Sequence, residues 1–220
     1  MRELRFGRRG ALSGTVRSMV VLVHGYGADG ADLLGLADVL GEHLPDTVFV
    51  APDAPERCVG GGFGFQWFPI PWLDGSAVAL AEAGLDAAAA DLNGFLDALL
   101  VAEGLGPEAL ALVGFSQGAM MSMHIAPRRA VAVAGVVAIS GRLLRPERLG
   151  AEVVARPPVL LVHGDGDPVV PFQDMGRAGE ALRAAGFEVF GHVMRGAGHT
   201  IAPDGLGVAL RFLQERLPGE

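Results

Sequence analysis

The sequence predicts a single α/β domain, residues 1–220, in which a mostly parallel β-sheet carries helices on both faces. Short apolar runs recur along the chain, and each is followed by a turn containing Gly or Asp and then by a stretch with helical spacing. Most runs are apolar at every position, as strands buried on both faces of a parallel sheet must be. With 220 residues, half of them hydrophobic, the chain can build one sizeable core.

The elements follow one another in a regular order. The N-terminal sequence RELRF alternates in polarity and predicts an antiparallel strand at the sheet edge. The apolar runs predict strands at 19–23, 47–51, 109–113, 132–139, 158–162 and 187–193. Helical spacing predicts helices at 31–43, 76–103, 117–126, 172–185 and 203–216. Gly84 and Gly94 lie inside the second of these helices and each costs about 1 kcal/mol relative to alanine, so a break there is the alternative.

The segment 52–75 has no periodicity, is rich in Gly and Pro, and contains both tryptophans. Long segments of this kind within compact domains are usually functional loops. We therefore expect its aromatic side chains to shape a substrate pocket, namely those of Phe63, Phe65, Trp67, Phe68 and Trp72. Three methionines follow Ser116 in the chain, and a place in the core is the better explanation for them: Met120, Met121 and Met123.

Composition narrows the classes of partner and the cellular location. The net charge is −8 and all 17 basic residues are arginines without a long basic run, so a nucleic acid backbone would be repelled. The longest apolar runs are far shorter than the roughly 20 residues that span a bilayer, so we expect no stable membrane insertion. The N-terminus lacks the apolar core of a signal peptide, and the single Cys58 cannot form an internal disulfide. These features favour the cytoplasm.

The stretch VGFSQGAM, residues 113–120, places Ser116 between Gly114 and Gly118, after a predicted strand and before a predicted helix. In that context the G-x-S-x-G pattern predicts a serine on a sharp, strained turn, with glycines that let the strand and the helix approach closely. The N-terminal end of the helix then stabilises negative charge that develops at the serine. The alternative is a solvated serine in a glycine-rich turn.

A serine nucleophile needs a base, and the base needs a carboxylate that orients it. The order expected for this arrangement is Ser, Asp, His. Asp167 follows the strand at 158–162 in HGDGDPVVP, and His199 follows the strand at 187–193 in GAGHTI. Asp165 is the alternative acid, but Asp167 is preferred because Asp-Pro opens the loop toward the next helix. Three residues in the expected order at strand ends favour a Ser116, Asp167 and His199 triad over chance.

The other histidines fit structural positions better. His24 and His163 follow apolar strands directly and precede glycine, so structural hydrogen bonds are expected of them. The remaining three lie within predicted helices or within the last strand: His43, His124 and His192. No group of His, Cys, Asp or Glu has metal-ligand spacing, so we expect neither a metal nor another cofactor.

Acyl-transfer chemistry also needs N–H donors for an oxyanion. The backbone N–H of Gln117, next to Ser116, is one expected donor. The loop VHGYGADG, residues 23–30, supplies the second, which we assign to the backbone N–H of Tyr26. The glycines of this loop match neither phosphate-binding pattern, and the chain has no lysine.

Six stretches occur in order and span nearly the whole chain: LVHGYGADGADLLGLADVL, APDAP, WF, GFSQGAM, HGDGDPVVP and GAGHTI. Together they resemble the bacterial carboxylesterase and acyl-protein thioesterase family of α/β-hydrolases. The resemblance implies an α/β-hydrolase fold with a minimal lid, and the same five site residues. It implies action on small esters, lysophospholipids or acyl thioesters, and a homodimer is common in similar families. Tyr26 stands where this family often has leucine, and Pro69 stands where it often has an acidic residue. These differences affect the size of the pocket, but they leave the backbone N–H donor of Tyr26 unchanged.

The predicted function is that of a serine carboxylesterase acting through an acyl-enzyme. Ser116 attacks the carbonyl, His199 transfers the proton, and Asp167 orients the imidazole. The partner is then a small-molecule ester or thioester. The alternative from another class is a binding module that keeps the fold without catalysis and holds an acyl or lipid ligand.

Overall fold

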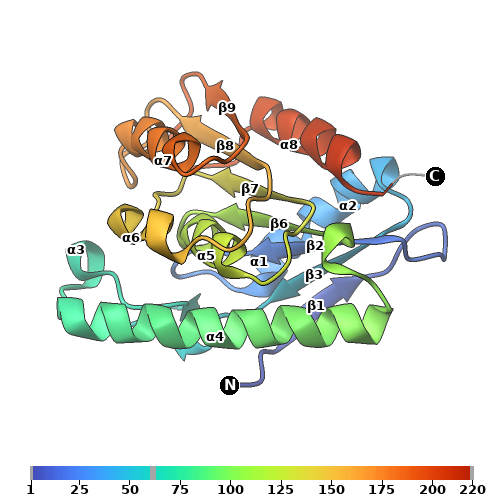
Figure 1. The fold of residues 1–220 in the computed structure, drawn as a ribbon, viewed down its shortest axis with the longest axis horizontal. Coiled ribbons are helices and arrows are strands. Elements are labelled where there is room, and N and C mark those ends of the chain that lie inside the picture. Colours follow the sequence, from blue (N-terminus) through green and yellow to red (C-terminus); the bar gives the residue numbers. More distant parts are fainter. Residues whose placement is uncertain (1, 60–62, 219–220) are drawn as a thin grey trace.

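A seven-stranded sheet crosses the protein in the order β1-β3-β2-β6-β7-β8-β9 (Figure 1). The structure is a computed structural model and describes residues 2–59 and 63–218. The strands are β1 (Phe6–Arg9), β2 (Ser18–Val23), β3 (Thr47–Pro52), β6 (Leu110–Phe115), β7 (Gly135–Ile139), β8 (Val159–Gly164) and β9 (Val189–Met194). Only β1 pairs antiparallel, with β3, and the other neighbouring pairs of this sheet are parallel. The predicted mostly parallel sheet is confirmed.

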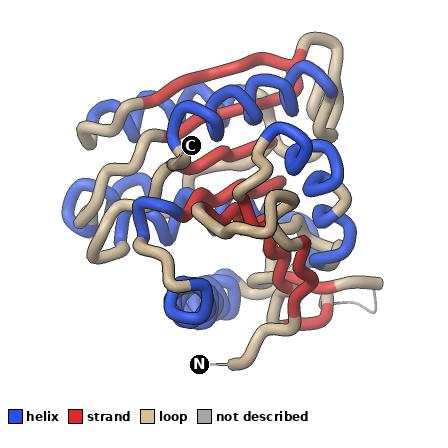
Figure 2. Tube along the Cα trace, turned by 90° about the vertical axis from the view of Figure 1, so that its right-hand side faces the viewer, coloured by secondary structure: helices blue, strands red, loops and turns tan. Residues whose placement is uncertain are grey.

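Helices cover both faces of the sheet (Figure 2). They are α1 (Gly30–Leu34), α2 (Leu36–Leu40), α3 (Pro71–Asp74), α4 (Val78–Glu103), α5 (Gln117–Ile125), α6 (Pro146–Glu152), α7 (Gln173–Ala184) and α8 (Pro203–Arg216). Short 3₁₀ turns occupy Gly41–His43, Pro107–Ala109 and Ala126–Arg128. Along each central strand, alternate side chains enter one of two separate cores. One core contains α4, α5 and α7, and the other contains α1, α2 and α8.

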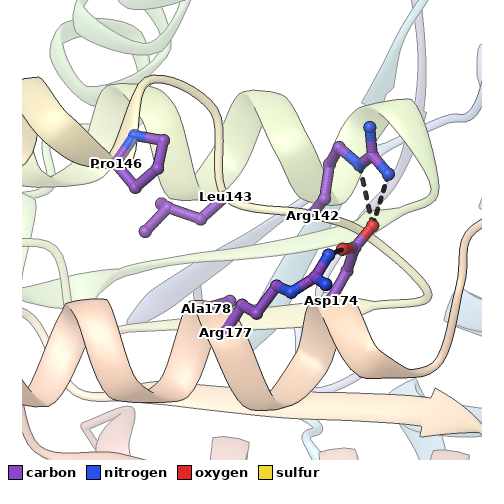
Figure 3. Close-up of a pocket in the computed structure, with 6 residues that line it drawn as sticks. All are labelled: Arg142, Leu143, Pro146, Asp174, Arg177 and Ala178. Carbon is purple, nitrogen blue, oxygen red and sulfur yellow. Dashed lines mark hydrogen bonds and ion pairs between the residues drawn. The ribbon is translucent and has the colours of Figure 1, made fainter.

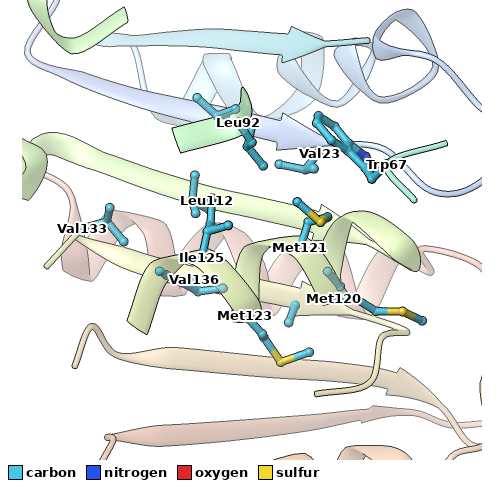
Figure 4. Close-up of a cluster of buried hydrophobic side chains, with 14 of the residues drawn as sticks. Val23, Trp67, Leu92, Leu112, Met120, Met121, Met123, Ile125, Val133 and Val136 are labelled. Atoms are coloured by element: carbon cyan, nitrogen blue, oxygen red, sulfur yellow. The ribbon is translucent and has the colours of Figure 1, made fainter. Parts of the chain in front are cut away.

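The methionines after Ser116 are core residues, as expected. Met120, Met121 and Met123 are at most 1% exposed. Figure 4 shows them within the buried cluster that also contains Leu112 and Val136 of the sheet. The unbranched thioether side chains fill the space between α5 and the strands, so α5 is fixed on the sheet directly behind Ser116.

The N-terminal edge strand is antiparallel as predicted, but it begins later. The prediction placed it at residues 2–6, whereas β1 runs over Phe6–Arg9 and pairs with β3. Residues before β1 leave the sheet, because the Arg2 N–H and Nε donate to the Asp91 carboxylate on α4 at 2.7 and 2.6 Å. Leu4 is buried in the core beside that helix. A tertiary ion pair therefore replaces the strand pairing that the alternation suggested.

The structure differs from the sequence-based prediction at residues 31–43, at residues 52–75 and at α6, and it decides the alternative left open for the long helix. The helix expected at 31–43 is divided near Gly35 and Gly41 into α1, α2 and a 3₁₀ turn. Helix α4 is continuous through Gly84, so the break considered there is absent. The segment 52–75 contains α3 and a two-stranded antiparallel hairpin of β4 (Glu56–Arg57) and β5 (Phe65–Gln66), and α6 was not predicted.

The helices of the described residues lack the features that a bilayer requires. None of them combines the length and the apolar character needed to cross a membrane.

Candidate active site

The candidate site residues follow different strands at one edge of the sheet. Ser116 follows β6, the loop with Tyr26 follows β2, Asp167 follows β8, and His199 follows β9. Because these strands are parallel, their carboxyl ends meet at the same edge, which is where ligands bind in open α/β sheets. The topology therefore brings together residues that are far apart in the sequence.

Ser116 lies on a sharp turn between β6 and α5, with φ 54° and ψ −117°. A positive φ costs a residue with a side chain about 1–3 kcal/mol and persists only where the surrounding structure fixes it. The Ser116 N–H donates to Ile139 O at 2.8 Å, and the Ser116 carbonyl accepts from Met120 N at 3.1 Å. These bonds tie the turn to β7 and α5, and the serine has the strained backbone that the G-x-S-x-G pattern predicts.

The two glycines of this pattern are required by close backbone contacts. A Cβ on Gly114 would collide with the carbonyl of Gly118, and a Cβ on Gly118 would collide with the carbonyl of Val23 on β2. Strand β6 and helix α5 can therefore approach each other, and α5 can approach β2, only if both positions lack a side chain. The close approach holds Ser116 at the start of α5.

His199 connects Ser116 to a carboxylate. Its Nε2 lies 2.9 Å from Ser116 Oγ, and its Nδ1 lies 2.7 Å from Asp167 Oδ2. In the matching tautomer Nδ1–H donates to Asp167, and Nε2 accepts from the serine hydroxyl. The His199 side chain is 17% exposed and the Asp167 side chain is unexposed, so solvent reaches the base but not the acid behind it.

Backbone groups stabilise the charged form of Asp167. Its Oδ1 accepts from the N–H groups of Val169 and Val170 at 2.8 and 2.9 Å. Burial by itself would raise the pKa of this carboxyl, but the bonds from His199 and from the two N–H groups outweigh burial and hold the pKa below its usual range. Asp167 is therefore ionised at neutral pH and oriented toward the imidazole.

His163 also contacts Asp167, which the sequence did not predict. Its Nε2 lies 3.0 Å from Val170 O, the expected structural bond, and 3.3 Å from Asp167 Oδ2. The side chains of His163 and Asp167 are 2% and 0% exposed. His163 lies near the end of β8 and Asp167 follows four residues later, and that short spacing is the one sequence signal for the contact.

Asp165 serves a different hydrogen bond. It is exposed, and its Oδ1 accepts from the N–H of Gly196 at 2.7 Å. Gly196 belongs to the loop that carries His199. The structure therefore places Asp167 next to the imidazole and uses the alternative acid, Asp165, to fasten the neighbouring loop.

The loop after β2 lies against Ser116. A Cβ on Gly25 would be 3.1 Å from Ser116 Cβ, which places the backbone of residues 25 and 26 beside the nucleophile. Within residues 2–59 and 63–218, neither the N–H of Tyr26 nor that of Gln117 has a hydrogen-bond acceptor. Both expected oxyanion donors are thus free to bind an incoming oxygen.

The Gln117 side chain fixes the segment 67–68 to the nucleophile turn. Its Oε1 accepts from Trp67 N at 2.9 Å, and its Nε2 donates to Phe68 O at 2.6 Å. The Trp67 indole N–H donates to His24 O at 3.0 Å, and Trp67 has no exposed surface. The expectation that Trp67 lines the pocket is therefore wrong, because it is a core residue that anchors this segment.

An apolar pocket of about 250 Å³ lies beside that segment. Phe68 and Trp72 line it, together with residues of α4 and of the chain before α6: Val78, Ala81, Glu82, Leu85, Leu144 and Arg145. Trp72 is 56% exposed and Phe68 only 4%. The tryptophan therefore forms the open side of the pocket and the phenylalanine its inner wall.

Two other aromatic side chains of the segment lie elsewhere. Phe63 is 97% exposed, so it contacts almost no part of the described structure. Phe65 on β5 is stacked by Arg57, whose guanidinium carbon is 4.3 Å from the ring centroid, and by Arg5 at 5.5 Å. Neither side chain lines the apolar pocket, and the pocket assignments of Phe63 and Phe65 are corrected accordingly.

The remaining polar candidates are structural in this geometry. His24 is buried, its Nε2 accepts from Ala54 N at 2.9 Å, and burial lowers its pKa. Cys58 is a free, buried cysteine. Burial of the Tyr26 hydroxyl, followed by its charge interactions and hydrogen bonds with Cys58 and Asp74, raises the pKa of Tyr26 to about 12. Over the described part of the chain, no three His, Cys, Asp or Glu side chains are grouped so that they could hold a metal ion.

The chain is similar to known esterases and acyl-protein thioesterases. A family model described as phospholipase/carboxylesterase matches residues 12–217. Acyl-protein thioesterase 1 of Neurospora crassa is 28% identical over 90% of this chain and 86% of its own, and Esterase YpfH of Escherichia coli is 27% identical over 92% and 84%. Among solved structures, that of esterase PE8 has a TM-score of 0.93 and 44% identity, covering 98% of this chain and 100% of the other.

Proposed function

This chain belongs to the phospholipase/carboxylesterase family of α/β-hydrolases and is a serine hydrolase of carboxylic esters or acyl thioesters, and we propose that Ser116, His199 and Asp167 carry out its reaction. The observation that supports this assignment most strongly is the continuous hydrogen-bonded path from Ser116 Oγ through His199 to the buried Asp167 carboxylate. A solvated turn serine would have no such partner.

The geometry fits a two-step reaction through an acyl-enzyme. His199 Nε2 accepts the Ser116 hydroxyl proton while Oγ attacks the substrate carbonyl, and the imidazolium then donates that proton to the departing alcohol or thiol. A water molecule next loses a proton to the same nitrogen and attacks the acyl-serine. The imidazolium then returns that proton to Ser116 Oγ as the bond between Oγ and the acyl carbon breaks, which releases the acid and restores the hydroxyl. Asp167 holds the imidazole in the tautomer that leaves Nε2 free to accept.

The oxyanion of each tetrahedral intermediate needs donors that are in place before the reaction. We assign this role to the backbone N–H groups of Gln117 and Tyr26. The support is that Gly25 packs against Ser116 Cβ and that both N–H groups lack acceptors within the described residues. Because the donor of Tyr26 belongs to the backbone, its unusual side chain does not remove it.

The apolar pocket is the proposed binding place for the acyl chain. It adjoins the segment that Gln117 fastens to the nucleophile turn, and Phe68 and Trp72 supply apolar area for a hydrocarbon chain. Its volume of about 250 Å³ favours small acyl groups. Small-molecule esters and thioesters are the substrate class of the family.

The cellular location and the oligomeric state are proposed from the sequence alone. The single cysteine, which cannot form an internal disulfide, supports the cytoplasm, which cell fractionation would test. The resemblance to families with dimeric members supports a homodimer. Sedimentation at several protein concentrations would distinguish a homodimer from a monomer.

A fluorophosphonate probe distinguishes the hydrolase from a binding module with the same fold. We expect stoichiometric labelling of Ser116 in the folded protein, parallel loss of ester hydrolysis, and no labelling of Ser116→Ala. A folded protein that binds acyl ligands but is neither labelled nor hydrolytic would instead support the binding module.

A further inference from the structure

Two arginines share one buried carboxylate beside the apolar pocket. Arg142 Nε and Nη2 both donate to Asp174 Oδ2, at 2.9 and 2.5 Å, and Arg177 Nη1 donates to Asp174 Oδ1 at 3.2 Å. Figure 3 shows both guanidinium groups directed at this carboxylate. The three side chains line a hollow of about 250 Å³ with Leu143, Pro146 and Ala178.

This cluster carries an excess of positive charge. Asp174 is 5% exposed and supplies one negative charge, whereas two guanidinium groups surround it. The side chains of Arg142 and Arg177 are 31% and 76% exposed. Each guanidinium keeps further N–H donors beyond those bonds. The cluster is therefore an exposed cationic surface in a protein whose net charge is −8.

Two observations place the cluster beside the nucleophile turn and the apolar pocket. A Cβ on Gly141, the residue before Arg142, would lie 3.1 Å from the carbonyl oxygen of Ser116. The Arg142 guanidinium carbon lies 4.7 Å from the ring centroid of Trp72, the residue on the open side of the apolar pocket. A substrate that extends along Trp72 therefore reaches the free donors of Arg142.

We propose that Arg142 and Arg177 form an anion subsite that selects substrates bearing a carboxylate or phosphate group away from the scissile ester or thioester. The proposal rests on the hydrolase function proposed above. The planar guanidinium group matches both of these oxyanions through paired hydrogen bonds. Asp174 neutralises one of the two guanidinium charges and leaves one net positive charge for the ligand.

A charge series separates this subsite from a purely structural ion network. Arg177→Gln removes the excess charge and leaves the bond between Arg142 and Asp174 intact. Asp174→Asn removes the carboxylate and leaves two positive charges. An anion subsite responds to these changes in opposite directions, whereas a structural network is weakened by both. Arg211→Gln is the matched control, because Arg211 is an exposed arginine on α8, which packs on the opposite face of the sheet.

Two pairs of substrates measure the preference. The carboxylate arm compares monomethyl glutarate with methyl 4-carbamoylbutanoate, its neutral amide of the same shape. The phosphate arm compares 1-octanoylglycerol 3-phosphate with 1-octanoylglycerol. In each arm the measured quantity is the ratio of kcat/KM for the anionic ester to kcat/KM for the neutral ester. Because the ratio is internal to each variant, a general loss of active protein cancels.

We expect Arg177→Gln to lower the ratio about two- to five-fold and Asp174→Asn to raise it, in at least one arm, with Arg211→Gln unchanged. Added salt should reduce the difference. Which arm responds identifies the oxyanion. Ratios that move together in both variants, or that do not move in either arm, overturn the subsite. Absence of hydrolysis of all four esters by the unmodified protein would instead overturn the proposed function.

Discussion

At the scale of single residues, Asp167 and Asp165 have distinct positions in spite of their nearly adjacent places in the sequence. Asp167 lies 2.7 Å from His199 Nδ1, whereas Asp165 binds the Gly196 N–H. We expect Asp167→Asn to lower kcat by orders of magnitude, because the amide favours the wrong imidazole tautomer. Asp165→Asn should lower it far less, and steady-state kinetics of both purified variants decide the ranking. The reverse ranking would show that Asp165 is the acid of the triad.

His124 on α5 makes stability depend on pH. Burial, followed by the charges of Arg128 and Arg145, lowers its pKa to about 4. In the unfolded chain the value is about 6.5, so the unfolded state binds the proton first as the pH falls. The free energy of unfolding should therefore decrease between pH about 6.5 and about 4, by about 3 kcal/mol in total from this group.

His124→Leu should flatten this dependence, which urea unfolding at a series of pH values measures. His43→Gln is the control, because His43 is exposed and belongs to neither buried core. An unchanged slope between pH 6.5 and 4 in His124→Leu would contradict a neutral buried imidazole.

Among individual residues, the sequence predicted those whose position depends on strand ends. Ser116, Asp167 and His199 each follow an apolar strand, and parallel topology then brings them together. Trp67 could not be placed, because its burial depends on bonds to His24 and Gln117 that no local pattern encodes. The pair formed by Arg142 and Asp174 joins the loop after β7 to the first turn of α7 and has no signal in the sequence near either residue.

At the scale of elements, the packing of α5 on the sheet can be tested with two glycines in helices. A Cβ on Gly118 would collide with the carbonyl of Val23, whereas nothing lies within 4 Å of a Cβ on Gly176 in α7. We expect Gly118→Ala to lower the free energy of unfolding by about 1–3 kcal/mol or more, and also to lower kcat, because α5 must shift. Gly176→Ala should stabilise by about 0.5–1 kcal/mol and leave kcat unchanged. Urea unfolding and kinetics would refute the packing account if both variants behaved alike.

The segment around α3 can be tested through acyl-chain length. Trp72 forms the open side of the apolar pocket, whereas Phe65 stacks on Arg57 outside it. Trp72→Ala should therefore raise KM for octanoate esters more than for acetate esters. Phe65→Ala should change both to a similar extent. A series of 4-nitrophenyl esters measures this, and equal effects of Trp72→Ala on all chain lengths would remove Trp72 from the pocket.

The sequence predicted long, strongly periodic elements better than short ones. The helix expected at 203–216 matches α8, and the one expected at 76–103 differs from α4 by two residues. Gly84 does not break α4. Pro69 packs against the helix at this position, where a Cβ would lie 2.9 Å from the proline ring, so the position favours glycine. Short elements such as α6 depend on tertiary contacts, and the hairpin of β4 and β5 has too few residues to show a period.

At the scale of the whole molecule, one sheet separates two cores, and we expect it to make them unfold together. Leu92 of α4 lies in one core and Leu213 of α8 in the other, both unexposed. Replacing either with alanine should cost about 2–5 kcal/mol. Leu213→Ala should also shift the fluorescence transition of Trp67, which lies in the other core. If Leu213→Ala shifts the unfolding transition seen by circular dichroism but not the one seen by fluorescence, the two faces of the sheet unfold separately.

The whole fold brings Ser116 into contact with His199, and the proposed reaction requires that Ser116 carry the acyl group. The most direct measurement is mass spectrometry of the protein quenched with acid during turnover of 4-nitrophenyl acetate, followed by peptide mapping. We predict an acetyl group on the peptide containing Ser116, and neither an adduct nor appreciable turnover in Ser116→Ala. Undiminished turnover by Ser116→Ala, or an acetyl group on another side chain that carries the turnover, would contradict the assignment.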